Sequence, residues 1–515
     1  MVMEEIQIGW VSTILHWMSI AFIMLIGTLF ALTIVVYFID RFQTEHAIRH
    51  NYPVIARFRY LFEYLGKFLR QYMFAADQDE WPFNRAQRSW VYRAAKNLTT
   101  TQSFGSTRNI NFPGKILFTN CAFPTLEKDS VTSPPLIIGE NCKHPYRAES
   151  FFNISGMSYG ALSRPAILAL SKGAKQASCW LNSGEGGVTP YHLEGGGDIV
   201  AQIGTAKYGY RDKNGNLSNE KLREVAGNEQ VKMFEIKMSQ GAKPGKGGIL
   251  PGNKVTQEIA DIRGIPVGEA SMSPNRHPDI NSNKELLGMI HQVRDVTCKP
   301  VGFKFVMGAP EWINQLCEEM VEMGEDYIPD FITIDGGEGG TGSAPVALMD
   351  DVGLPLGEAL PVVIDTLKQY GLRNRVKVIA SGKLINPTMV AWALAIGADF
   401  IVSARGFMFS LGCIQAMQCH KDTCPTGVTT HNKRLQSGLN PAMKSKRVAS
   451  YHNNLVNEVA LIAHSCGVSE PRQLSRSDVR KVQGTGKSIA FSEIYPEVVE
   501  THQYQNLKGI KISER

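Results

Sequence analysis

The sequence Asp330-Phe-Ile-Thr-Ile-Asp335-Gly-Gly-Glu-Gly-Gly-Thr-Gly342 joins a short apolar run to a dense cluster of glycines. A run of this length, bounded by a glycine signal, predicts a buried strand over 330–335. Glycines directly after a strand are typical of backbone that turns sharply or packs closely against a ligand. The stretch therefore predicts one strand with a functional loop at its carboxyl end.

The same unit recurs along the chain, with room for helices between the repeats. Eight apolar runs predict strands, at 152–157, 178–183, 231–237, 265–271, 300–306, 330–335, 376–381 and 399–403. Amphipathic helical patterns lie between most of them, as at 163–176, 283–295, 311–323, 357–370 and 387–396. Eight alternating strands and helices predict an α/β fold of the (β/α)8 TIM-barrel type, with a doubly wound parallel sheet as the alternative.

Glycine clusters follow several of these runs, and a barrel would bring them to one face. Active sites of such barrels gather where the strands end, and glycine-rich loops expose backbone N–H groups that bind phosphate. We therefore expect a ligand site built from four clusters, which are Asn182-Ser-Gly-Glu-Gly-Gly187, Gln240-Gly-Ala-Lys-Pro-Gly-Lys-Gly-Gly248, Asp335-Gly-Gly-Glu-Gly-Gly-Thr-Gly342 and Ser381-Gly-Lys383.

The loops after the seventh and eighth predicted strands hold cations beside glycines. Gly382 and Lys383 follow the seventh strand, and Arg405 and Gly406 follow the eighth. Barrel phosphate sites usually form from these two loops. Tight turns alone would explain one glycine cluster, but four clusters with two cations favour a phosphate-bearing cofactor. A mononucleotide is favoured over a dinucleotide, because no GxGxxG fingerprint opens a βαβ unit near the start.

Charged side chains near the third and fourth predicted strands indicate the chemistry of the expected site. Lys237, Lys243 and Arg263 are cations that could hold carboxylates or stabilise an anionic reduced flavin. Glu185 lies within its glycine loop, where a carboxylate could serve as a proton donor or as a ligand for ammonium. Taken singly, each of these charges is more often a solvated loop residue.

Three cysteines crowd into the window Cys413-Ile-Gln-Ala-Met-Gln-Cys419-His-Lys-Asp-Thr-Cys424, with the spacing C-x5-C-x4-C. Three thiolates in so short a loop can hold one iron–sulfur cluster, and a proline after the last cysteine also occurs in ferredoxin-like runs. Zinc usually takes four ligands and fits less well, unless Cys466 or His420 adds a fourth. An odd total of nine cysteines fits a disulfide framework poorly, so we expect a reducing compartment.

The N-terminal segment has the composition of a membrane anchor. No charged residue occurs between Glu5 and Asp40, and about 20 apolar residues suffice to cross a bilayer. A signal peptide or a buried core helix is the alternative, but a signal peptide has a basic start and a shorter apolar core. Arginines follow the span and none precedes it. The positive-inside rule therefore predicts a single-pass protein of the cytoplasmic (inner) membrane, with its barrel on the cytoplasmic side.

Composition also limits the partners and divides the chain. A net charge of +6 on 515 residues, without a basic stripe interleaved with aromatics, gives no reason to expect nucleic acid. The expected anchor covers residues 1–40. A basic, aromatic helical segment over 41–90 either lies near the membrane or packs against the barrel. The barrel domain extends over 91–470, and a C-terminal extension over 471–515.

Several motifs, in order along the chain, resemble the central FMN-binding domain of glutamate synthase. They are Gly156-Met-Ser-Tyr-Gly-Ala-Leu-Ser163, Asn182–Gly187, Lys237-Met-Ser-Gln-Gly-Ala-Lys-Pro-Gly245 with Leu250-Pro-Gly252, Gly339-Gly-Thr-Gly342, and the cysteine window within 412–428. The resemblance spans roughly residues 100–470. It implies a (β/α)8 barrel with FMN and a [3Fe–4S] cluster, whose ligands would be Cys413, Cys419 and Cys424.

The resemblance also implies roles for individual residues. Glu185 is similar to the family's glutamate near ammonia and the flavin, and with Lys243 it is an expected catalytic residue. Lys237, Gln240 and Arg263 are the expected substrate-binding residues, and Arg263 resembles an arginine that grips a substrate carboxylate. The implied cofactor contacts are Met157, Ser158, Tyr159, Asn182, Gly184, Gly339, Gly340, Gly382, Lys383, Arg405 and Gly406.

The implied reaction is the transfer of a hydride from reduced FMN to 2-iminoglutarate, formed from 2-oxoglutarate and ammonia. This would make the protein an oxidoreductase acting on CH–NH2 donors. The family's amidotransferase domain and an NAD(P)H fingerprint have no match here, so we expect ammonia as nitrogen source and a separate electron-transfer partner.

Two other functions stay open. Lys284 falls where the family has a substrate-side glutamate, a reversal of charge that would suit a different amine, amino acid or 2-oxo acid at a membrane-linked FMN enzyme. A non-catalytic membrane scaffold is the remaining hypothesis, and the intact Lys, Glu and Cys motifs weigh against it.

Overall fold

The computed structural model describes residues 2–499 and divides the chain into two compact units, Met1–Ala86 and Gln87–Arg515. Residue 1 of the expected anchor and residues 500–515 of the expected extension lie outside the described part. The second unit holds all the predicted site residues, and the first holds the expected membrane anchor.

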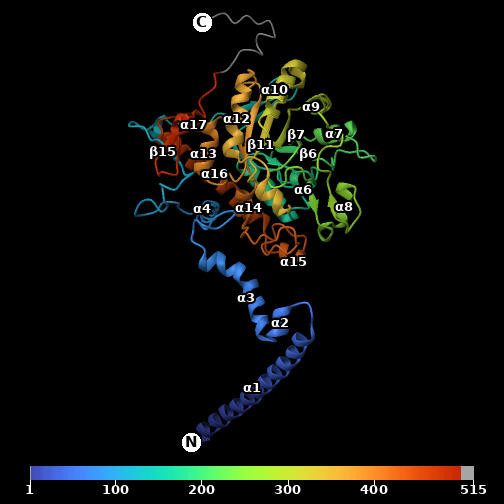
Figure 1. Ribbon diagram of the computed structural model, residues 1–515, viewed down its shortest axis with the longest axis vertical. Helices are drawn as coiled ribbons and strands as arrows, with labels where there is room; N and C mark the ends of the chain where they lie inside the picture. Colours follow the sequence, from blue (N-terminus) through green and yellow to red (C-terminus); the bar gives the residue numbers. More distant parts are fainter. Residues whose placement is uncertain (1, 500–515) are drawn as a thin grey trace, which may run out of the picture. The chain divides into compact units, whose positions relative to one another are not determined.

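The second unit is built on a closed barrel of eight parallel strands (Figure 1), which confirms the predicted (β/α)8 TIM-barrel fold. Around the barrel the strand order is β10-β11-β12-β13-β4-β5-β6-β7. Lys237 on β7 pairs in register with Lys304 on β10, and Asp335 on β11 pairs with Ser381 on β12. The strands are β4 Phe152–Ile154, β5 Leu181–Asn182, β6 Ile199–Ile203, β7 Val231–Lys237, β10 Val301–Val306, β11 Phe331–Asp335, β12 Lys377–Ser381 and β13 Phe400–Ser403.

One predicted strand is wrong, and one strand of the barrel was missed. Residues 265–271 lie in the long connection after β7, where only β9 (Ser271–Met272) is extended, antiparallel to β8 (Ile249–Leu250). The segment is largely exposed, because its glycines and proline form turns rather than a buried run. The missed strand is β6, whose five residues are all buried. Only the short helix α6 (Pro190–Leu193) separates it from β5, so its spacing does not read as a β–α repeat.

Helices cover the outside of the barrel, and the five helices predicted between strands are confirmed. Local capping explains several boundaries. The Ser163 side chain accepts a hydrogen bond from the N–H of Ala166 at the start of α5, and Asn386 does the same for Met389 at the start of α13. The helices are α4 Arg85–Ala95, α5 Arg164–Gln176, α7 Asn219–Ala226, α8 Gln257–Arg263, α9 Asn283–Thr297, α10 Glu311–Met323, α11 Val346–Asp351, α12 Leu356–Gln369, α13 Pro387–Ile396, α14 Arg405–Leu411, α15 Lys433–Gln436, α16 Pro441–Ser465 and α17 Phe491–Ile494.

Short antiparallel elements complete the second unit. The hairpin of β2 (Leu136–Ile138) and β3 (Tyr146–Ala148) packs its buried residues into one apolar cluster with barrel residues such as Phe331 and Phe400, which begin or lie early in their strands. The hairpin thereby closes the end of the barrel where the strands begin. Elsewhere β14 (Val479–Val482) pairs with both β1 (Ile116–Phe118) and β15 (Ser488–Ala490), so part of the expected C-terminal extension joins a sheet with an early strand.

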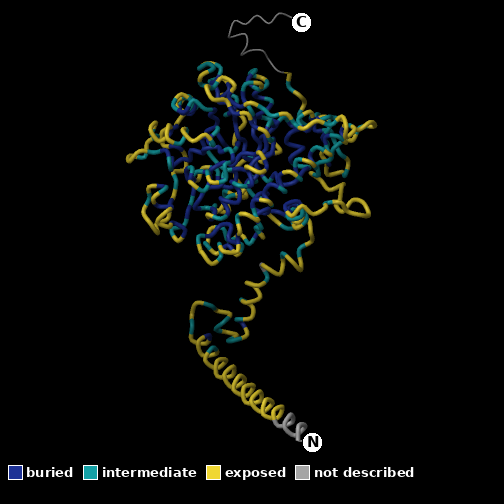
Figure 2. Tube along the Cα trace, turned by 180° about the vertical axis from the view of Figure 1, so that it is seen from behind, coloured by how far each residue is buried: buried dark blue, intermediate teal, exposed yellow. Residues whose placement is uncertain are grey.

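The first unit contains the long helix α1 (Val2–Phe42), followed by α2 (Ala47–Asn51), α3 (Ile55–Leu69) and a π-helical turn over Arg70–Phe74. Between Trp10 and Phe42, α1 is exposed almost throughout (Figure 2). Within residues 2–499 it is the one helix that is both long and apolar enough to cross a bilayer. Its length and composition are those of a membrane span or of a signal sequence.

Candidate active site at the open end of the barrel

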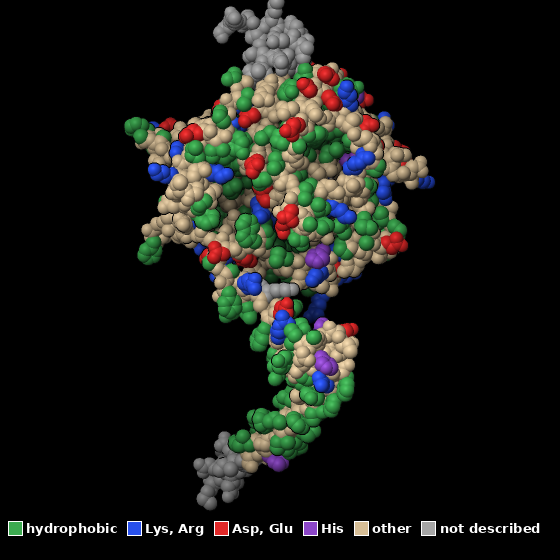
Figure 3. All heavy atoms as spheres, viewed as in Figure 1, with side chains coloured by type: hydrophobic (Ala, Val, Ile, Leu, Met, Phe, Trp, Pro, Cys, Tyr) green, Lys and Arg blue, Asp and Glu red, His purple; other side chains and the backbone are tan. Residues whose placement is uncertain are grey.

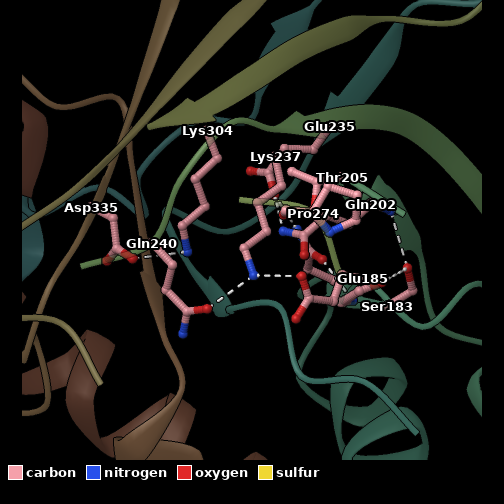
Figure 4. A network of polar contacts seen from close by, with 12 residues as sticks. Ser183, Glu185, Gln202, Thr205, Glu235, Lys237, Gln240, Pro274, Lys304 and Asp335 are labelled. Atoms are coloured by element: carbon pink, nitrogen blue, oxygen red, sulfur yellow. Dashed lines mark hydrogen bonds and ion pairs between the residues drawn. The ribbon is translucent and has the colours of Figure 1, made fainter. Parts of the chain in front are cut away.

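A chain of three polar side chains links the loops at the carboxyl ends of the strands. Lys237, the last residue of β7, places its Nζ 3.0 Å from Glu185 Oε2 and 2.9 Å from Gln240 Oε1 (Figure 4). Gln240 in turn donates from Nε2 to the carbonyl oxygen of Gly340 at 2.8 Å. The structure therefore brings together predicted residues from the loops after β5, β7 and β11.

The charges around Glu185 keep its carboxylate ionised. Burial raises the pKa of Glu185, but the positive charges of Lys237, Lys243 and Arg263 outweigh burial and bring the pKa to about 2. Such a group is ionised throughout the neutral pH range. Of the two roles expected for Glu185, this favours the ammonium ligand over the proton donor.

Lys243 is a buried cation without a direct partner. The residue is 3% exposed, and its Nζ forms no hydrogen bond or ion pair with any group in residues 2–499. Burial lowers the pKa of Lys243 to about 8, although the nearby charge of Glu185 raises it. A pKa in this range suits a group that donates or accepts a proton near neutral pH.

Arg263 closes the other side of the site, next to the loop after β4. Its Nη2 donates to the carbonyl oxygen of Tyr159 at 3.1 Å, and its guanidinium lies over the ring of Tyr208 at 5.2 Å. The Nε of Arg263 is buried and has no partner in the described residues. Arg263 thus retains a donor that a substrate carboxylate could use.

Beneath these residues lies a buried polar network that sequence reasoning missed. Glu235 on β7 accepts hydrogen bonds from Asn182 at 2.8 Å, Gln202 at 2.6 Å and Thr333 at 2.7 Å. Lys304 on β10 pairs with Asp335 at 3.3 Å, and Asp335 also accepts from Ser381 at 2.8 Å. A charged residue inside an otherwise apolar strand is the sequence signal that could have revealed Glu235 and Lys304, because buried charges need partners.

The predicted residues of the loops after β4 and β5 lie against each other. A Cβ on Gly184, which has a φ of +66°, would come within 2.5 Å of the backbone nitrogen of Ser158. The N–H of Met157 contacts the carbonyl oxygen of Asn182 at 3.4 Å, and Tyr159 donates from its hydroxyl to Glu258 at 2.6 Å. Glycine at 184 is therefore required for the two loops to approach.

The glycine loops after β11, β12 and β13 converge as well. Gly382, with a φ of +135°, lies against the backbone of Gly336, and a Cβ on Gly340 would contact the guanidinium of Arg405 at 3.1 Å. Gly339 packs against the Asp335 carboxylate. Lys383 is half-buried, and burial lowers its pKa while the charges of Glu338 and Asp350 raise it.

Gly406 has a packing role that the sequence did not reveal. A Cβ at this position would come within 2.2 Å of the Tyr451 hydroxyl and 2.9 Å of Ser403 Oγ. Its lack of a side chain therefore lets α14 approach α16. Arg405, next to it, donates to the carbonyl oxygen of Thr341 and lies 3.8 Å from Cys419 Sγ, so it joins the glycine loop to the cysteine window.

The cysteine window folds as a tight loop beside the site. Gln415, Met417 and Asp422 adopt positive φ angles between 51° and 60°, which non-glycine residues adopt only when their surroundings hold them there. Burial raises the pKa of Cys413 to about 11. Burial also raises the pKa of Cys424, but hydrogen bonds from Thr426 and Thr429 outweigh it and lower the pKa overall.

Three cysteine thiols are the ligand type that iron–sulfur clusters take, but in this structure the three side chains are not arranged around one point. Within residues 2–499, no three His, Cys, Asp or Glu side chains converge closely enough to hold a metal ion. A missed residue docks the window: the buried Lys254 amine donates to the carbonyl oxygens of Ala161 and Thr429 at 2.9 Å and of Cys419 at 3.3 Å.

Lys284, the predicted departure from the family pattern, lies away from the site, whereas His277, in the loop over residues 273–278, contacts it. Lys284, on α9, is 61% exposed and pairs with Glu322 at 3.8 Å, so in this structure it contacts none of the mouth residues. His277 is fully buried and contacts the Lys237 carbonyl oxygen through Nε2 at 3.1 Å, while its Nδ1 has no partner in the described residues. The 273–278 loop therefore reaches the site through His277.

Comparison with known proteins identifies the family. The family model described as a conserved region in glutamate synthase matches residues 115–469. The glutamate synthase large subunit-like protein YerD of Bacillus subtilis is 41% identical over 491 residues, covering 87% of this chain and 93% of its own length. An archaeal-type glutamate synthase (NADPH) of Thermotoga neapolitana is 34% identical over 64% of this chain, and the match spans 62% of that protein.

Among solved structures, an active mutant of (S)-mandelate dehydrogenase overlaps 71% of this chain and 88% of its own, with a TM-score of 0.46 and 11% identity. The family model covers more than half of the chain, and the strands that it spans form the barrel whose open end carries the polar site. The chain therefore belongs to the family defined by the conserved region of glutamate synthase.

Proposed function

We propose that this glutamate synthase-like oxidoreductase forms glutamate from 2-oxoglutarate and ammonia at the open end of its barrel. The observation that carries the proposal is the Glu185 carboxylate, held ionised among Lys237, Lys243 and Arg263. An ionised carboxylate can bind ammonium, and the cations around it can bind the two carboxylates of 2-oxoglutarate. The site thus offers groups of the right charge for both substrates.

The residues at the mouth fit FMN as the cofactor. Three glycine loops converge with Lys383 and Arg405 close to them, which suits a phosphate. On the other side, Lys237 and Lys243 suit the anionic ring of a reduced flavin. Met157, Ser158, Tyr159, Asn182 and Gly184 would line the cofactor, together with Gly339, Gly340 and Gly382. When bound, reduced FMN would supply the hydride for the imine carbon.

The protein's own side chains would manage charge and protons. Arg263 would orient one substrate carboxylate through its unpaired Nε, and Gln240 would hold Lys237 in place. Ammonium held by Glu185 would give one proton to the neutral amine of Lys243, and the resulting ammonia would add to the oxo carbon. The protonated Lys243, with its pKa near 8, would then return that proton to the hydroxyl that leaves as water, so that the net change is ammonium and the oxo acid to the protonated imine and water.

The cysteine window would hold a [3Fe–4S] cluster through Cys413, Cys419 and Cys424. Three thiols in one tight loop, with Arg405 and Lys254 against it, support this proposal. The loop would have to close around the cluster, because its thiols do not converge in the ligand-free geometry.

We also propose that α1 anchors the protein in the cytoplasmic membrane, with the barrel on the cytoplasmic side. The apolar length from Trp10 to Phe42 and the arginines that follow it support this placement. A separate redox partner would then deliver electrons. The same anchor favours the second candidate function, a membrane-linked FMN enzyme that acts on a different amine, amino acid or 2-oxo acid.

The test is an anaerobic reoxidation assay on the full chain in detergent. The bound flavin is reduced, and its reoxidation is followed after addition of 2-oxoglutarate with and without ammonium. Rapid reoxidation only with both compounds supports glutamate synthesis, and Lys284→Ala serves as a matched control outside the site. Intact reduced flavin that is not reoxidised by the two compounds together overturns the proposed substrates in favour of the second candidate.

A further inference from the structure

Helix α3 has an apolar face that no residue of the first unit covers within the described range. It carries Ile55, Phe58, Leu61, Phe62, Leu65, Phe68 and Leu69, which are between 37% and 72% exposed. A repeat of about 3.6 residues per turn places these residues on one side of the helix. We call this set the α3 apolar face. Seven exposed large side chains on one short helix are too many for a surface that faces water alone.

The charges around this face match a negatively charged surface. Arg59 and Glu63 lie outside the α3 apolar face, and Arg57, at its edge, is paired with Asp40. Residues 40–76 contain six lysines and arginines against Asp40, Glu45 and Glu63, which is a net charge of +3. A helix with bulky apolar residues on one side and cations on the other is typical of helices that lie in the interface of an anionic bilayer.

The turn between α1 and α3 is fixed by a buried carboxylate. Asp40, near the end of α1, is fully buried and accepts hydrogen bonds from Arg57 Nε at 2.9 Å and Nη2 at 2.8 Å. It also accepts from the backbone N–H of Val54 at 3.0 Å. A bidentate arginine–carboxylate pair has a defined geometry, so α3 leaves the end of the long apolar helix, whose hydrophobic surface is visible in Figure 3, in a set direction.

We propose that α3 lies in the membrane–water interface of an anionic phospholipid bilayer, with the α3 apolar face at the boundary between headgroups and acyl chains. The proposal rests on the membrane anchoring by α1 and extends it to a second contact. The connection between the two helices supports lipid as the contact. The hydrogen bonds of Asp40 that fix α3 lie in the last turn of the apolar helix α1, which ends at Phe42.

The test uses photo-crosslinking of the full chain in nanodiscs. A benzophenone amino acid replaces Phe62, on the α3 apolar face, or Tyr64, two residues further along and therefore about 200° around the helix. The two side chains are 64% and 59% exposed, so exposure to water alone does not distinguish them. Leu29, in the middle of the apolar stretch of α1, is the third position.

Mass spectrometry then counts lipid adducts in nanodiscs with and without phosphatidylglycerol. We expect lipid adducts at position 62 to exceed those at 64 by at least about fivefold, and to fall when phosphatidylglycerol is replaced by phosphatidylcholine. If position 29 gives lipid adducts but positions 62 and 64 give equal numbers of them, the interfacial placement of α3 is overturned and the anchor is not. The same holds if position 62 crosslinks to protein. Absence of lipid adducts at 29 would overturn the anchor as well.

Discussion

Both ends of the barrel bury a carboxylate among cations, but the two sites differ in how fully the charges are paired. Where the strands begin, the Asp330 side chain is fully buried and contacts Arg294 Nε at 2.9 Å, Arg375 Nη2 at 2.9 Å and the Val301 N–H at 2.8 Å. Where they end, the Glu185 side chain remains 19% exposed and has one ion-pair partner, Lys237, among the described residues.

The difference separates two uses of buried charge. Asp330 ties α9 to the starts of β10 and β12, and its charge is compensated within the fold, as expected at the stability face of a barrel. Buried atoms without a hydrogen-bond partner in the described residues occur at both ends, Asp330 Oδ1 and Arg375 Nε where the strands begin and Arg263 Nε where they end. The open end differs in Lys243, a cation that is 3% exposed and has no side-chain hydrogen bond or ion pair within residues 2–499. Such a charge could still be paired with an anionic ligand.

The largest effect is expected at the stability end. Asp330→Asn leaves two partly buried arginines, Arg294 and Arg375, without their fully buried countercharge, and breaking a buried ion pair costs about 3–5 kcal/mol. Urea unfolding of the detergent-solubilised protein, followed by tryptophan fluorescence, measures the loss. Glu185→Gln is the matched variant and should cost less, about 1–3 kcal/mol, because the Glu185 side chain is 19% exposed, although the lowered pKa shows that the nearby cations stabilise its charge. Equal losses of unfolding free energy in the two variants would contradict the difference in charge pairing between the two ends of the barrel.

The second expected effect is on turnover. Glu185→Gln keeps the shape of the side chain but removes the charge that would bind ammonium, so the rate of glutamate formation should fall by about 100-fold or more. Bound flavin should stay unchanged, and an absorbance spectrum checks this. Wild-type turnover in the variant would exclude Glu185 from the chemistry.

A smaller effect concerns the pH dependence of stability. Burial lowers the pKa of Lys243 to about 8 from its ordinary 10.5, so the cost of burying its charge is complete below pH 8 and disappears as the pH rises to 10.5. Lys243→Met should therefore be more stable than the parent at pH 7, by up to about 3 kcal/mol, because the lowered pKa already includes the attraction to Glu185. The melting temperatures of the parent and of Lys243→Met should converge as the pH rises from 7 to 10. A difference between the two melting temperatures that widens with pH would contradict the lowered pKa of Lys243.

The smallest effect is expected at Lys284. This lysine is exposed and pairs only weakly with Glu322 in the described residues, and exposed pairs contribute about 0–1 kcal/mol. Lys284→Ala should leave both stability and kcat/KM nearly unchanged. A shift in substrate preference would show instead that α9 moves towards the site on binding.

Much of the barrel and its mouth could be predicted because the signals are local. Each predicted strand and the loop that follows it, such as the run at 330–335 and its glycines, are neighbours in the sequence. The strand β6 was missed because a four-residue helix breaks the expected spacing. Glu235, Lys304 and Lys254 were missed because their partners come from distant segments, which no local pattern reveals.

The central claim, that the incompletely paired charges at the open end bind a dicarboxylate beside the flavin, has a direct measurement. Oxidised protein is titrated with 2-oxoglutarate, and the flavin difference spectrum is recorded for the parent and for Arg263→Gln. The account predicts a saturable change whose Kd rises at least about tenfold in the variant, or 1.4 kcal/mol. No spectral change in the parent, or an equal Kd in the two proteins, would contradict it.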